Sequence, residues 1–77
     1  MQNEMAMLII ELYHQDKKLV RIVHEKISAH PNKHMKYLYY LANDICAITI
    51  NEGYKIVRIT LSYFVDHVEH SKTIWRA

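Results

Sequence analysis

The sequence predicts an all-α fold of about four helices in a single domain, residues 1–77. The chain has 77 residues with one glycine and one proline, whereas a β-domain of this size usually needs a turn residue every few positions. Apolar residues recur at intervals of three and four along most of the chain, which is the spacing of an amphipathic helix. They make up 51% of the sequence, which argues against a disordered protein.

The first two helices are predicted at residues 4–13 and 17–29. In the first, the apolar residues at helical spacing are Met5, Leu8, Ile9 and Leu12. In the second, they are Leu19, Val20, Val23 and Ile27. Asn3 and Asp16 are suitable N-caps for the two helices. Because the residue before a proline is disfavoured in the α-region, His30 marks the expected end of the second.

The third predicted helix, residues 33–50, contains the longest apolar run of the chain. Helical spacing divides it into two faces. The apolar face consists of Leu38, Leu41, Ala42, Ile45 and Ile48. The other face carries Tyr37, Tyr40, Asp44 and Ala47, with Asn43 beside them. Gly53 is expected to end the helix in a left-handed conformation.

A fourth helix is predicted at residues 54–69. Its apolar stripe consists of Val57, Thr60, Leu61, Phe64, Val65 and Val68. The β-branched residues at 56–60 also permit a strand, but the spacing of three and four that continues to Val68 favours a helix. Since the connections are short, successive helices are expected to pack as neighbours.

The composition argues against several classes of function. The formal net charge of +2 is small and the basic residues are scattered, so no direct nucleic-acid contact is expected. The single cysteine, Cys46, excludes a disulfide within the chain and favours a reducing compartment. No apolar stretch reaches the roughly 20 residues of a membrane span, and no signal peptide is visible, so no membrane partner is expected.

Neither a metal site nor an enzyme is indicated. His67 and His70 are three residues apart, but no second pair of ligands has a defined spacing, and solvated histidines are the favoured alternative. Cys46 is most simply a small buried hydrophobic residue. No phosphate-binding loop or nucleophile motif is present. We therefore expect no catalytic residues, no metal ligands and no cofactor.

The candidate binding residues are Tyr37, Tyr40, Asn43 and Asp44. Tyrosine rings supply rigid contact area, while Asn and Asp side chains can hold polar groups of an extended peptide. The alternative is a partly exposed side of the helix, whose aspartate bonds to a neighbouring helix end or to an arginine.

The run YLANDI, residues 40–45, resembles the central helix of the RNA polymerase II C-terminal-domain-interaction domain (CID), as in regulators of nuclear pre-mRNA. The flanking pairs Leu19-Val20 and Val23-His24 and the triplet Asn32-Lys33-His34 follow the same pattern. The resemblance implies a right-handed superhelical stack of the ENTH/VHS type, whose groove binds the extended heptad-repeat tail of the polymerase. It implies a hydrogen bond from the peptide's turn to Asp44, with Asn43 and Tyr40 beside it.

The function that this resemblance implies is a nuclear, non-catalytic adaptor in transcription regulation, termination or mRNA 3′-end processing. Its partner would be the polymerase tail, with or without phosphate. Counterparts of the family's first and last helices are missing, so a short or truncated form is expected, with uncovered faces that favour a homo-oligomer. The alternative is a small helical self-assembly or protein-interaction domain with no peptide groove.

Overall fold

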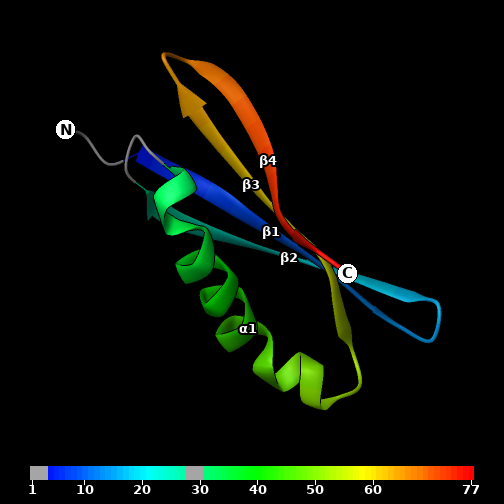
Figure 1. Ribbon diagram of the computed structural model, residues 1–77. Coiled ribbons are helices and arrows are strands. Elements are labelled where there is room, and N and C mark those ends of the chain that lie inside the picture. Colours follow the sequence, from blue (N-terminus) through cyan, green and yellow to red (C-terminus); the bar gives the residue numbers. More distant parts are fainter. Residues whose placement is uncertain (1–3, 28–30) are drawn as a thin grey trace.

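The computed structural model describes residues 4–27 and 31–77, which form an antiparallel β-sheet with an α-helix against it (Figure 1). The strands are β1 (Glu4–His14), β2 (Lys17–Ile27), β3 (Lys55–Val65) and β4 (Val68–Arg76). Between β2 and β3 come a short 3-10 helix, η1 (Pro31–His34), and the α-helix α1 (Met35–Asn51). The prediction of an all-α superhelical stack is therefore wrong.

The four strands lie in the order β2-β1-β3-β4, and every neighbouring pair is antiparallel. β1 and β2 pair without interruption along their full length. Each of the other two pairings contains one irregularity, after Glu11 in β1 and after Ile59 in β3. The two hairpin turns lie at opposite ends of the molecule (Figure 1), which measures 42 × 20 × 18 Å.

Both hairpins turn through two residues with positive φ. These are Gln15 (47°) and Asp16 (66°) in the first, and Asp66 (50°) and His67 (66°) in the second. Two consecutive positive φ angles are characteristic of the type I′ turn, whose twist matches that of the flanking strands. Since none of the four residues is glycine, each turn carries backbone strain that an Asn-Gly turn would relieve. A chain with a single glycine can therefore still form two tight hairpins.

The core lies between α1 and the sheet. Alternate residues of β1 are buried beneath the helix, namely Ala6, Leu8, Ile10 and Leu12. β3 contributes Ile56, Ile59 and Leu61, and α1 contributes Leu38, Ala42 and Cys46. The buried stripe of α1 ends at Thr49, whose hydroxyl accepts a hydrogen bond from Nη1 of Arg21 on β2 (3.3 Å). β1 thus anchors the fold, since it lies inside the sheet and its inner face is apolar from Ala6 to Leu12.

Three of the four predicted helices are strands. Residues 4–13 and the described part of 17–29 form the β1–β2 hairpin, and residues 54–69 cover β3 and the beginning of β4. Both faces of these segments are rich in apolar residues, so the two-residue period of a strand fits them as well as the period of a helix. Which structure forms then depends on pairing with neighbouring strands. Asp16 lies in a turn instead of capping a helix. Asn3 and His30 lie outside the described residues.

The helix predicted at residues 33–50 is present as α1, but its buried face is rotated from the predicted one. Leu38 and Ala42 are buried as predicted, whereas Ile48 is 74% exposed. Gly53 has the predicted positive φ, at +105°, and a Cβ atom there would lie 2.8 Å from Cε1 of His14. Gly53 therefore permits both the turn after α1 and the close approach of the end of β1.

Candidate functional site

Among the described elements, α1 covers one face of the sheet and nothing covers the other, which we call the open face (Figure 1). Side chains alternate between the faces of a strand, and directly opposed residues of antiparallel strands share a face. The open face of the two inner strands therefore comprises Met5, Met7, Ile9, Glu11 and Tyr13 of β1, and Arg58, Thr60, Ser62 and Phe64 of β3. That of the outer strands comprises Lys18, Val20, Ile22, His24 and Lys26 of β2, and Glu69, Ser71, Thr73 and Arg76 of β4.

The centre of the open face is apolar on the β2 and β1 side. Ile9 lies between its partners Ile22 on β2 and Thr60 on β3. Ile22 is 57% exposed, and Met5 and Val20 are also largely exposed. A sheet face that contacts only water usually carries polar residues in alternation with the core. Grouped apolar side chains on this face are instead typical of a surface that contacts another molecule.

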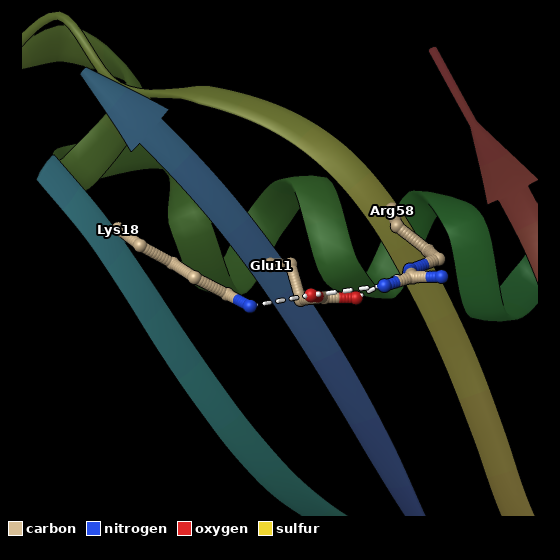
Figure 2. A network of polar contacts seen from close by, with 3 residues as sticks. All are labelled: Glu11, Lys18 and Arg58. Atoms are coloured by element: carbon tan, nitrogen blue, oxygen red, sulfur yellow. Dashed lines mark hydrogen bonds and ion pairs between the residues drawn. The ribbon is translucent and has the colours of Figure 1, made fainter. Parts of the chain in front are cut away.

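One end of the open face holds a network of charged side chains centred on Glu11 (Figure 2). Nε of Arg58 donates to Oε2 of Glu11 at 2.5 Å, and Nη2 donates to Oε1 at 3.2 Å. Nζ of Lys18 lies 3.0 Å from the same Oε1. The three residues come from β3, β2 and β1, so the network joins three adjacent strands. A two-pronged contact between guanidinium and carboxylate is the strongest common geometry for such a pair.

The network changes the ionisation of Glu11. Hydrogen bonds from Arg58 and then Lys18 lower the pKa of the Glu11 carboxyl from 4.5 to about 2, against the opposing effect of its burial. Glu11 is only 9% exposed, so its charge would be costly to bury without these partners. The same hydrogen bond raises the pKa of Arg58. Glu11 is therefore ionised at neutral pH, and its contacts with Arg58 and Lys18 connect the three strands.

The structure places the four candidate binding residues on α1, away from the open face. Tyr37, Tyr40 and Asp44 come together on the exposed outer side of the helix. The amide of Asn43 donates to the backbone oxygen of Tyr39 at 3.2 Å. In the part of the chain that the structure describes, no second α-helix stands beside them to form a groove wall. Peptide binding by these residues stays a prediction.

Cys46 is fully buried on the inner side of α1, and this burial raises the pKa of its thiol. Burial also makes the thiol inaccessible to solvent in the folded chain. Within residues 4–27 and 31–77, no group of three or more His, Cys, Asp or Glu side chains is placed to hold a metal ion.

Comparison of the chain with protein-family models, curated proteins and solved structures gives no match. The resemblance to the polymerase-tail-interaction domain thus gains no support from relatives. No helix in the described ranges is long and apolar enough to cross a membrane.

Sequence reasoning missed the open face because it assigned Met5, Ile9 and Val20 to helical stripes. One signal could have revealed it. Gln15-Asp16 precedes a segment rich in β-branched residues and Asp66-His67 follows another, and polar dipeptides beside such segments are typical of hairpin turns. Asp44 drew attention as the acidic residue of an apolar helix, yet it is exposed. Glu11, also within an apolar run, is the buried acid.

Proposed function

We propose that this chain is a non-catalytic protein-interaction domain that self-associates through its open face. The observation that carries the proposal is Ile22. It is a large β-branched side chain in the middle of β2, it is 57% exposed, and it lies beside Ile9 and Val20. Burying the exposed half of such a side chain contributes on the order of 1 kcal/mol. A second copy provides the same apolar surface to cover it.

The size of the open face suits a small dimer. Strands of 11 residues span about 36 Å, and four strands side by side span about 18 Å, so the face covers roughly 600 Å². A standard stable interface buries about 800 Å² on each partner. Because the face is slightly smaller and partly polar, we expect a dissociation constant in the range of about 1 µM to 1 mM.

The edges of the sheet are less suited to self-association than the face. β2 forms one edge and carries Lys17, Lys18 and Lys26, which would meet like charges if two β2 strands paired. β4 forms the other edge, and its register with β3 shifts at Ile74. Lysines and bulges are the usual devices by which natural proteins prevent pairing between edge strands. The face is left as the surface on which a second copy can pack.

The Glu11 network lowers the electrostatic repulsion between two copies that pack through their open faces. Glu11 offsets the charges of Arg58 and Lys18 within one copy, so the charged end of the face carries less net positive charge than its lysines and arginines suggest. Charges at the rim of an interface remain partly hydrated and contribute little to affinity in either direction. The apolar centre around Ile9 and Ile22 is then the part that decides affinity.

Sedimentation equilibrium of the wild type, Ile22→Asp and Ile48→Asp tests the proposal. Ile48 is the matched control, because it is the same residue type, is more exposed and lies on α1 instead of the open face. Ile22→Asp should raise the dissociation constant roughly 100-fold or more, since each dimer loses two isoleucines and gains two carboxylates. Ile48→Asp should leave it unchanged.

A wild type that stays monomeric at millimolar concentration would rule out self-association. Dissociation by Ile48→Asp alone would place the interface on the helix. Circular dichroism of both variants will show whether either one is unfolded. We expect both to be folded, because the two substituted positions are exposed.

The adaptor function for the polymerase tail remains an untested prediction. The predicted nuclear location depends on that function. Both depend on a groove between stacked helices, and the described chain folds as a sheet with one α-helix. The self-assembly alternative does not depend on that groove, and the open face gives it a physical basis. For this reason we favour self-association over peptide-tail binding.

A further inference from the structure

A pocket of about 300 Å³ lies between the first two turns of α1 and the end of β4. It is on the helix side of the sheet, opposite the open face. Its lining consists of Met35, Lys36, Tyr39, Tyr40, Ile74 and Trp75. Five of these six side chains are apolar or aromatic, and Lys36 is the single charged group of the lining.

A bulge in β4 builds the strand side of this pocket. Ile59 pairs with Trp75, whereas the next residue, Thr60, pairs with Thr73, so Ile74 is an extra residue without a partner on β3. In a regular strand, Ile74 and Trp75 would point to opposite faces. The bulge changes this alternation, and both residues line the same pocket.

Contacts among the aromatic rings define the helix side. The Tyr39 and Trp75 rings lie 5.6 Å apart at 39°, which connects α1 to β4. The Tyr39 and Tyr40 rings lie 5.7 Å apart at 66°, in an edge arrangement. Because each ring contacts a neighbour, the pocket is formed in the free protein and need not be assembled by a ligand. Pre-formed, mostly apolar cavities with few polar groups are typical of small-molecule sites.

We propose that this pocket binds a small aromatic carboxylate. Its volume is at the lower end of the range of about 300–1,000 Å³ for ligand sites, which fits a single ring with a short chain. The rings of Tyr39, Tyr40 and Trp75 contact the aromatic body of the ligand. Lys36 pairs with its carboxylate, and the lining holds no acidic side chain to repel it. An aromatic cation is disfavoured by the same lysine.

The indole N–H of Trp75 supplies the readout, because the chain has a single tryptophan and the signal needs no assignment. Three probes of similar size share a phenyl ring and a three-carbon chain and differ in the terminal group and its charge: 3-phenylpropionate, 3-phenylpropan-1-ol and 3-phenylpropylammonium. In ¹H–¹⁵N spectra, 3-phenylpropionate should shift the Trp75 signal saturably, with a dissociation constant on the order of 1 mM. The alcohol should bind about fivefold more weakly, as expected for loss of a half-exposed ion pair, and the ammonium probe more weakly still.

Two lysine variants test the source of this preference. Lys36→Gln should make 3-phenylpropionate and the alcohol bind equally, whereas Lys33→Gln, a matched change at an exposed lysine outside the lining, should keep the difference. Tyr40 is exposed, so Tyr40→Ser should weaken all three probes by about threefold without unfolding the chain.

The Ile22→Asp variant should bind 3-phenylpropionate as the wild type does, because the pocket and the open face lie on opposite sides of the sheet. The result therefore does not depend on self-association. Equal affinity for the three probes, persistence of the carboxylate preference in Lys36→Gln, or no saturable shift at Trp75 would each overturn the proposal.

Discussion

Replacement of Glu11 by glutamine tests how the sheet is held together. The substitution keeps the shape of the side chain but removes the charge that Arg58 and Lys18 surround. Glu11 has a folded-state pKa of about 2 against 4.5 for the free side chain. At about 1.4 kcal/mol per pKa unit this shift corresponds to at most about 3.5 kcal/mol. Lys18 and Arg58 are half-exposed, so screening by water reduces the expected contribution to about 1–2 kcal/mol.

The sign of the pH dependence follows from the direction of the shift. Because folding lowers the pKa of Glu11, the contribution is fully present above about 4.5 and is lost as the pH falls toward about 2. Urea unfolding of the wild type and Glu11→Gln at one protein concentration should therefore differ by about 1–2 kcal/mol at neutral pH. The difference should shrink steadily below the free-side-chain pKa.

Glu52→Gln is the matched control, since Glu52 is exposed beyond the end of α1. It should change the free energy of unfolding by less than about 0.5 kcal/mol. A Glu11→Gln variant as stable as the wild type at neutral pH would show that the network contributes nothing. An equal loss at pH 7 and pH 2 would show that packing, and not charge, explains the effect.

Three further changes test the packing and the turns, each by thermal or urea unfolding. Leu38→Ala, at a fully buried position of α1, should cost about 2–5 kcal/mol, whereas Ile48→Ala on the exposed side of the same helix should cost under about 0.5 kcal/mol; equal losses would place the buried face elsewhere. Gly53→Ala should destabilise by about 1–2 kcal/mol, because φ is positive there and the new Cβ would approach His14; a neutral effect would contradict this conformation. The double change Gln15→Asn and Asp16→Gly should stabilise by on the order of 1 kcal/mol if the turn is of type I′, and a loss of stability would argue against it.

The sequence allowed the central helix to be predicted but not the fold around it. In residues 33–50, apolar and polar residues do not alternate over a long stretch. Leu, Ala and Tyr residues recur at helical spacing and Gly53 follows, so periodicity and end signal both indicate a helix. In β1, by contrast, residues 5 to 10 are all apolar. A period of two and a period of three and four fit such a run equally well. The choice depends on which partner strands are available, and local sequence does not contain that information.

The turns explain the remaining error. Hairpins of type I′ usually contain Asn-Gly or Asp-Gly, and this chain uses Gln15-Asp16 and Asp66-His67 instead. Because these favoured turn residues are missing, the sequence gives only a weak signal for the two hairpins. Asp16 is also a suitable helix N-cap. The open face was missed for the same reason, since its members become neighbours only through the pairing of four strands.

The binding residues predicted on the helix illustrate the limit of local reasoning. Helical spacing correctly places Tyr37, Tyr40 and Asp44 on one exposed side of α1. Whether that side faces a groove depends on the neighbouring elements, which are strands. Tyr40 has a different environment from the expected one, because it lines the pocket beside Trp75. The helix was therefore predicted correctly, while peptide binding by its exposed side stays a prediction.

If two copies of the chain meet through the open face, contacts between differently labelled copies will come from that face. An isotope-filtered NOE experiment on a mixture of labelled and unlabelled chains detects only contacts between copies. We predict such contacts from the methyl groups of Ile22 and Ile9, and none from Ile48. Contacts between copies that arise only from α1, or only from the backbone amides at the free edges of β2 or β4, would contradict self-association through the open face.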